Sequence, residues 1–170
     1  MVIKEFSINY QELASTIMSG EYVCDVSSKM WVSAIKYAVE NIEQFSFDID
    51  SMHMLWIVNG GHIRRNVSDD KLILNWLKLI LPKYDGSDLQ LYRGECLFLY
   101  DQGLIGFCWT PKKQVAEMFA RGLNSAESGG VLLSAYVSSE AILSAREFNF
   151  EVQFPIKNQA AFRSSSKTTC

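Results

Sequence analysis

The sequence predicts an α+β domain in which helices come first and a sheet follows. Apolar residues recur at helical spacing in the first half, most clearly in the stretches that begin at Ser27 and Ser68. The second half instead contains short segments of β-branched and aromatic residues with turn residues between them. This segregation of the two patterns along the chain is typical of the α+β class.

Length and composition are those of an ordinary globular domain. The chain has 170 residues, 48% hydrophobic and 21% charged, so it is long enough to bury a core without disulfide support. The formal net charge of -3 comes from 16 Lys and Arg against 19 Asp and Glu. Such weak acidity gives no electrostatic footprint for duplex DNA or anionic lipid.

The sequence has few metal-binding residues and no segment typical of membrane targeting. The four cysteines lack zinc-type spacing, and His53 and His62 do not form a HExxH pattern, so no metal site is expected. The N-terminal segment has no apolar stretch typical of a secretory signal, and the longest apolar runs are too short to span a bilayer. We therefore expect a cytoplasmic protein with free thiols and no membrane partner.

The first half predicts two capped helices and a short apolar run between them. The helix that follows Ser27 should bury a face made of Met30, Trp31, Ala34, Ile35, Ala38, Val39 and Ile42. The run MHMLWIVNGG should stop at Gly60 and Gly61. A helix capped by Ser68 should end at Pro82 and bury Leu72, Ile73, Trp76, Leu77 and Ile80. Trp31, Trp56 and Trp76 are expected to anchor the core.

The second half predicts strands around one helix. KYDGSD indicates a turn or linker that leads into the strand LQLYRGE. Thr110 should cap a helix that Pro111 opens and that runs to about Arg121, with Val115, Ala116, Phe119 and Ala120 facing inward. A loop, GLNSAESGG, should precede the strand GVLLSAYV and the helical turn SSEAILS. In REFNFEVQF, alternation predicts one strand with Phe148, Phe150, Val152 and Phe154 opposite Asn149, Glu151 and Gln153.

Taken singly, the polar residues of this half have plain structural explanations. An Arg such as Arg93 can lie exposed on a strand while its stem covers apolar surface. Thr110 can be only a helix cap, and Glu151 a solvent-facing carboxylate. A buried position is usual for Cys108, and a core position for Tyr92, Trp109 and Phe119.

In combination, three short motifs resemble the mono-ADP-ribosyltransferase superfamily, in its Arg-Ser-Glu branch. They are LYRGE, WTPKKQVAEMFA and REFNFEVQF, and their order and spacing cover Leu89 to Phe154. The resemblance implies a split β-sandwich core behind N-terminal helices. It divides the chain into a helical part at 1–84, a sheet-rich NAD-binding core at 85–156 and a flexible tail at 157–170.

The resemblance also implies a reaction and its residues. NAD would be the substrate, cleaved between nicotinamide and ribose, and its ADP-ribose would pass to an acceptor. Glu151 would be the catalytic carboxylate that hydrogen-bonds the ribose in an oxocarbenium-like transition state. Arg93 would hold the diphosphate as a planar, permanently charged donor. Gly94 would let the ligand lie close to the backbone, and its backbone would meet the nicotinamide amide. Further NAD contacts would come from Cys108, Trp109, Thr110 and Phe119.

Two positions depart from the family pattern. Cys108 stands where the family has a Ser, so a thiol replaces a better hydrogen-bond donor beside Thr110. Asn149 stands two residues before Glu151, where arginine-directed members have a second Glu. Because an amide cannot deprotonate a guanidinium, Asn149 favours a different acceptor, such as Ser, Asn or a nucleobase. Phe148 and Phe150 could then offer an apolar or stacking surface.

Four functions stay open at this point. The first is an intracellular transferase, a toxin or defence protein that modifies a protein target after delivery into a host cell or under the control of a neutralising partner. The second is the same chemistry on nucleic acid, with Arg64, Arg65, Lys112 and Lys113 as a local basic path. The third is an NAD glycohydrolase, in which water is the acceptor. The fourth is an NAD-binding module that has lost turnover, which Cys108 motivates.

Overall fold

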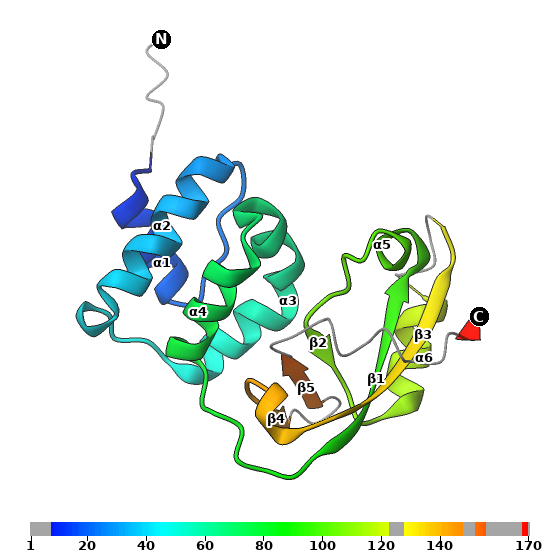
Figure 1. Cartoon of the computed structure of the whole chain (residues 1–170). Coiled ribbons are helices and arrows are strands. Elements are labelled where there is room, and N and C mark those ends of the chain that lie inside the picture. Colours follow the sequence, from blue (N-terminus) through cyan, green and yellow to red (C-terminus); the bar gives the residue numbers. More distant parts are fainter. Residues whose placement is uncertain (1–7, 123–127, 148–151, 156–167, 170) are drawn as a thin grey trace. The chain divides into compact units, whose positions relative to one another are not determined.

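The computed structural model describes residues 8–122, 128–147, 152–155 and 168–169. The chain divides into two compact units, Met1–Leu81 and Pro82–Cys170. The described part of the first unit is helical and the described strands all belong to the second, so the α+β class is confirmed (Figure 1). None of the described helices has the length and apolarity that crossing a membrane would require.

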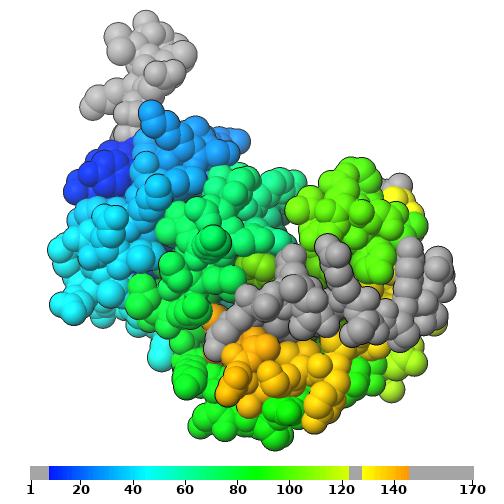
Figure 2. All heavy atoms as spheres, in the orientation of Figure 1, coloured from blue at the N-terminus to red at the C-terminus, as the bar shows by residue number. Residues whose placement is uncertain are grey.

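Over its described residues, 8–81, the first unit has four helices and one 3-10 turn: α1 (Tyr10–Met18), α2 (Ser28–Glu40), η1 (Ile42–Gln44), α3 (Ile49–Val67) and α4 (Asp70–Ile80). The core that they share includes Leu13, Ile17, Trp31, Ile35, Met52, Ile63, Ile73 and Leu77. In the space-filling view the blue to green spheres of this unit lie against one another (Figure 2). The unit is therefore held together by helix-on-helix packing of apolar faces.

The three tryptophans of the first unit are core residues, as predicted. Trp31 and Trp76 are fully buried and Trp56 is 3% exposed. The Trp76 ring reaches from α4 to α1, where its Nε1 donates to the Met18 sulfur at 3.5 Å. Trp31 stacks on Tyr22 with ring centroids 5.5 Å apart.

The helix after Ser27 forms where the pattern predicts it but is shorter. The Ser27 hydroxyl accepts a hydrogen bond from the Met30 amide, which confirms the cap. The helix ends at Glu40, and the residues after Asn41 form the 3-10 turn η1. Asn41 leaves the helical conformation there and its side chain donates to the Tyr37 carbonyl, which satisfies the helix end.

The prediction that Gly60 and Gly61 stop the apolar run is wrong. Both lie inside α3, which continues to Val67. Gly60 is buried, and a Cβ there would lie 2.9 Å from the Trp56 ring, whereas a Cβ on Gly61 would meet nothing within 4 Å. Gly60 therefore makes room for a tryptophan of its own helix, and packing outweighs the low helix propensity of the pair.

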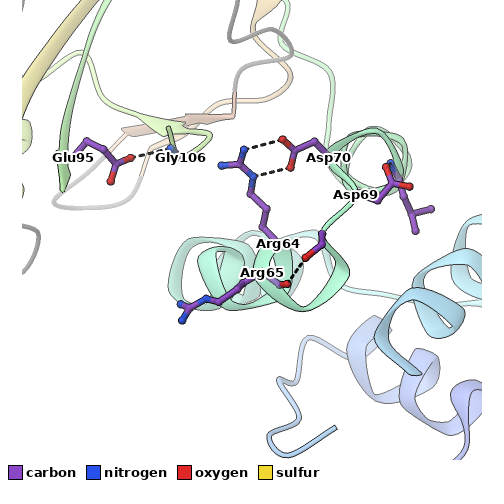
Figure 3. Close-up of polar contacts among 8 residues, drawn as sticks. Arg64, Arg65, Asp69, Asp70, Glu95 and Gly106 are labelled. Carbon is purple, nitrogen blue, oxygen red and sulfur yellow. Dashed lines mark hydrogen bonds and ion pairs between the residues drawn. The ribbon is translucent and has the colours of Figure 1, made fainter. Parts of the chain in front are cut away.

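The predicted cap of α4 is also wrong by one residue. Ser68 has a φ of 51°, a left-handed conformation, and it ends α3. The cap of α4 is Asp69, whose side chain accepts from the Leu72 amide at 3.0 Å. Across this turn the Arg64 guanidinium donates to both carboxylate oxygens of Asp70, at 2.7 and 2.8 Å, as Figure 3 shows. A bidentate ion pair thus joins the end of α3 to the start of α4.

The described strands of the second unit form two small antiparallel sheets. One has the order β1-β3-β6 and the other β2-β5-β4. The strands are β1 (Leu89–Cys96), β2 (Cys108–Trp109), β3 (Gly130–Val137), β4 (Arg146–Glu147), β5 (Val152–Pro155) and β6 (Thr168–Thr169). The helical elements are α5 (Leu97–Asp101), α6 (Lys113–Arg121) and η3 (Ser139–Ala141). The predicted strands LQLYRGE and GVLLSAYV and the predicted turn after Ser138 are confirmed.

Strands β1 and β3 form the longest ladder, which pairs Leu89 with Val137 and Cys96 with Gly130. Helix α6 lies against both strands (Figure 1). The approach is so close that a Cβ on Gly94 would collide with backbone atoms of Ala116 and Ala120, and one on Gly130 with the Ala120 carbonyl. Two glycines at neighbouring strand positions therefore let the helix backbone rest on the sheet.

The other side of β1 belongs to an apolar core. Successive strand side chains point to opposite faces, so Leu91, Arg93 and Glu95 lie opposite Gly94. Leu91 is buried in a cluster with Trp109 of β2, with Val131, Leu133 and Val137 of β3, and with Ile142, which directly follows η3. Arg93 and Glu95 thus lie on the same face of β1 as Leu91, which is apolar and fully buried.

The prediction of a single strand through REFNFEVQF is wrong. Arg146 pairs with Gln153 and Glu147 with Val152 in an antiparallel ladder, so β4 and β5 are two separate strands that run in opposite directions. The prediction that Glu151 and Asn149 share one face rested on one continuous strand. Residues 148–151, with Phe148, Asn149, Phe150 and Glu151, lie outside the described residues.

The two glycines of α3 give a matched test of the helix packing. Gly61→Ala should stabilise the protein by about 0.5–1 kcal/mol, because Ala is the better helix former and its methyl meets open space. Gly60→Ala should lower the free energy of unfolding by about 1–3 kcal/mol, because its methyl would press on Trp56. Urea denaturation followed by tryptophan fluorescence measures both. Destabilisation by both variants would show instead that the helix stops at the glycines.

Candidate active site

The candidate site begins with a buried ion pair on β1. Arg93 Nε lies 2.7 Å from Glu95 Oε2, and the two side chains are 19% and 3% exposed. The residues are two apart on one strand, so their side chains leave the same face of the sheet. A carboxylate this deeply buried is stable only if it is paired and hydrogen-bonded.

Glu95 meets that requirement through three donors. Besides Arg93, the Gly106 amide donates to Oε2 at 2.9 Å and the Cys96 amide donates to Oε1 at 3.0 Å. Figure 3 shows the Glu95 carboxylate directed at Gly106. Glu95 therefore connects β1 to the segment between α5 and β2.

Arg93 is held at two of its three nitrogens. Its Nη1 donates to the Cys108 carbonyl of β2, in addition to the Nε bond to Glu95. Gly106 packs directly on the guanidinium, since a Cβ at that position would collide with it. The side chain is consequently fixed between β1, β2 and the segment that leads to β2.

Thr110 lies beside the same strand. Its backbone pairs with Tyr92, with Tyr92 N to Thr110 O at 2.7 Å and Thr110 N to Tyr92 O at 2.9 Å. Because Tyr92 directly precedes Arg93, two of the motifs that lie apart in sequence are adjacent in the second unit. The structure thus brings Cys108 and Thr110 beside β1: the Cys108 carbonyl binds the Arg93 side chain, whereas Thr110 pairs with Tyr92 through its backbone.

Thr110 does not cap α6 as predicted. The helix begins at Lys113 with Lys112 as its first flanking residue, and the Thr110 hydroxyl accepts from the Lys112 amide at 3.2 Å. The pairing of Thr110 with Tyr92 explains the difference, because it keeps the Thr110 backbone extended and delays the helix. Ala116 and Ala120 are buried as predicted, while Val115 and Phe119 are half-buried.

The other predicted NAD contacts have different surroundings. The Trp109 side chain is 2% exposed within the apolar cluster, so the ring has a packing role. Cys108 is half-buried and takes part in no disulfide among the described residues. The face of Gly94 that lacks a Cβ is covered by α6, so the close approach it permits is to a helix. A nicotinamide contact from the Gly94 backbone stays a prediction.

The predicted catalytic carboxylate lies outside the described residues. Glu151 and Asn149 both fall in 148–151, and their distance to Arg93 is not defined. Strand β5 begins at Val152, the next residue in the chain, and pairs with β2 through Cys108 with Pro155 and Trp109 with Phe154. The strand that follows Glu151 is therefore hydrogen-bonded to the strand that carries Cys108.

Sequence reasoning missed Glu95 and Gly106. Glu95 had a signal, because strand alternation alone places its side chain on the same face as Arg93. Gly106 had none, because its role depends on the guanidinium that packs against it. Among the described residues, no group of three His, Cys, Asp or Glu side chains is arranged to hold a metal ion.

Comparisons with known proteins add no relative. No family model matches the chain, and neither the curated proteins nor the solved structures compared with it gave a match.

Removal of the buried carboxylate should be costly. Glu95→Ala should lower the free energy of unfolding by about 3–5 kcal/mol, because the Arg93 charge and the Gly106 amide lose their partner inside the protein. The control is Glu117→Ala, which removes an exposed i,i+4 pair with Lys113 and should cost only about 0.3–0.5 kcal/mol. Chemical denaturation measures both. Equal small losses would contradict a structural role for the Arg93–Glu95 pair.

Proposed function

We propose that the chain is an NAD-dependent mono-ADP-ribosyltransferase that modifies a macromolecular acceptor. The observation that carries the proposal is the joining of two motifs at one place: Tyr92 pairs with Thr110, and the Arg93 guanidinium binds the Cys108 carbonyl. Arg93 of β1 and Cys108 of β2, with Thr110 directly after β2, are thus neighbours among the residues that the family resemblance assigns to NAD. Two small sheets connected at this bridge also support our assignment of the second unit to the split β-sandwich core of the superfamily.

Arg93 has the chemistry that a diphosphate needs. A guanidinium carries five N–H donors, and the bonds to Glu95 and Cys108 use one on Nε and one on Nη1. Among the described residues no hydrogen bond occupies the donors that remain. Planar, permanently charged donors held in a fixed orientation suit the oxygens of a diphosphate.

The reaction follows from the same assignment. The bond between C1′ of the ribose and the nicotinamide nitrogen breaks, and neutral nicotinamide leaves with the electron pair. The acceptor forms a new bond to C1′ and gives its proton to solvent or a nearby base. Glu151 would hydrogen-bond the ribose hydroxyl as positive charge develops, and the hydroxyl of Thr110 would orient the carboxylate. The acceptor would be a protein side chain other than arginine or a nucleobase, because Asn149 replaces the second carboxylate.

A second candidate is an NAD-binding module without turnover. Glu95 neutralises much of the Arg93 charge, so the pair could serve the fold and bind NAD only weakly. Calorimetry separates the two functions, because heat of NAD binding without release of nicotinamide supports the module. Release of free ADP-ribose in the absence of any acceptor would instead support an NAD glycohydrolase.

If the chain is a transferase, mutation of the Glu151 carboxylate should reduce the transfer of ADP-ribose. Purified protein is incubated with NAD labelled in the adenylate and with cell extract, and the labelled fraction is digested with nuclease or with protease to identify the acceptor class. Glu151→Gln should reduce label transfer by about 10²–10³-fold, because a contact made in the transition state is lost. Unreduced transfer by Glu151→Gln would refute the role of Glu151.

Because Cys108 replaces the family's Ser, its mutation to Ser should increase activity, whereas mutation of Glu151 should decrease it. Cys108→Ser restores the hydroxyl found in the family and leaves the backbone carbonyl that binds Arg93 in place. One improved hydrogen bond of about 0.5–1.5 kcal/mol should raise kcat by about two- to tenfold with little change in KM. The control is Cys24→Ser, which alters an exposed thiol of the first unit and should change neither constant. A fall in kcat for Cys108→Ser would mean that the thiol itself is required.

A further inference from the structure

Glu95 is one of the few buried polar or charged residues in the described part of the chain, which are His53, Glu95, Thr110 and Ser144. It is the buried carboxylate of that set. An apolar residue at this position could fill the space without the desolvation of two charges. The presence of a carboxylate therefore indicates a requirement for its charge or for its hydrogen bonds.

The hydrogen bonds of Glu95 show what it controls. Oε2 accepts both from Arg93 Nε and from the Gly106 amide, so one oxygen atom fixes the guanidinium and the segment that packs on it. Oε1 is fixed in turn by the Cys96 amide of the same strand. The carboxylate is thus anchored to β1 and sets the angle at which the Arg93 plane lies.

The second hold on Arg93 comes from the other sheet. Nη1 donates to the Cys108 carbonyl, and Cys108 pairs with β5. With Nε and Nη1 both bound, rotation of the guanidinium about its long axis is prevented, and the remaining N–H groups keep one direction. Binding of a ligand to these N–H groups costs little conformational entropy, because the Arg93 side chain is already ordered.

We propose that Glu95 is a positioning residue that aligns the Arg93 guanidinium for the diphosphate of NAD. The inference rests on the proposed function and adds a residue that the family resemblance does not assign. Glu95 acts through Arg93 and through the Gly106 amide, and it does not touch the substrate.

Two accounts of Arg93 predict opposite effects of Glu95→Gln. If Arg93 contributed only positive charge, removal of the neighbouring carboxylate would leave the site more positive, and NAD would bind more tightly. If orientation matters, NAD should bind more weakly. Gln keeps the shape but offers one oxygen, so its amide group must face a donor, either the Cys96 amide or the pair Arg93 and Gly106.

The experiment measures NAD affinity by calorimetry and nicotinamide release by single-turnover kinetics, with circular dichroism to confirm that each variant is folded. Glu95→Gln should weaken NAD binding by about tenfold or more while the rate of nicotinamide release from bound NAD falls by less than about threefold. The matched control Glu117→Gln removes a carboxylate of the same unit that pairs with Lys113 on the surface, and it should change neither quantity.

A double-mutant cycle shows whether Glu95 acts through Arg93. In an Arg93→Lys background the planar guanidinium that Glu95 orients is absent. Adding Glu95→Gln should therefore change NAD affinity by less than about twofold. Unchanged or tighter NAD binding by Glu95→Gln alone, or an equal loss in both backgrounds, overturns the inference and leaves the proposed function standing. Wild-type protein that neither binds nor cleaves NAD overturns the proposed function, and the inference with it.

A measurement on the wild type covers the case in which Glu95→Gln does not fold. The Arg93 Nε–H should exchange with solvent at least about tenfold more slowly than the Nε–H of the exposed Arg65, as followed by ¹⁵N NMR, because a buried hydrogen bond must open first. Titration with NAD should shift the Arg93 Nη signals and leave the slow Nε–H exchange intact. Fast exchange at Arg93 Nε, or loss of its protection when NAD binds, contradicts positioning by Glu95.

Discussion

The second unit depends on a buried ion pair between Arg93 and Glu95. The pair lies on a strand that also carries the apolar core and supports a helix on its opposite face. A buried carboxylate is unfavourable unless its oxygens are hydrogen-bonded, and here the Arg93 guanidinium and the backbone amides of Cys96 and Gly106 donate to Glu95, while the Cys108 carbonyl accepts from Arg93. The Arg93–Glu95 pair thereby joins β1, the approach to β2 and β2 itself. The same geometry that makes the pair tolerable also gives Arg93 a fixed direction.

Two constraints act on the glycines around this pair, and they are distinct. Gly94 lacks a side chain because the backbone of α6 occupies the space where a Cβ would lie. Gly106 lacks one because the Arg93 guanidinium occupies it. The family resemblance attributes Gly94 to ligand binding, but helix packing is by itself a sufficient reason for glycine at that position. Arg93 and its partners therefore support the proposed function, whereas Gly94 does not discriminate between ligand binding and helix packing.

The sequence predicts elements well where one period dominates. The helix after Ser27, the strand around Arg93 and the strand from Gly130 formed as predicted, because apolar spacing and local caps agree there. Errors arose where distant contacts overrule local preference. Gly60 lies within a helix, where its missing side chain makes room for Trp56. Pairing with Tyr92 keeps Thr110 extended, and antiparallel pairing divides the segment around Glu147 and Val152 into two strands. Only the family resemblance led us to expect the strand of Arg93 beside the segment of Thr110. Strand alternation could have added Glu95 to the site. The role of Gly106 could be seen only in three dimensions.

The most direct test of this account is a crystal structure of the full chain with ADP-ribose, the part of NAD that the transferase retains. The account predicts diphosphate oxygens within hydrogen-bonding distance of the Arg93 Nη atoms, with Arg93 Nε still bound to Glu95 and the Glu151 carboxylate at the ribose. Binding of ADP-ribose away from Arg93, or a Glu151 side chain remote from the ribose of a ligand held by Arg93, would contradict it.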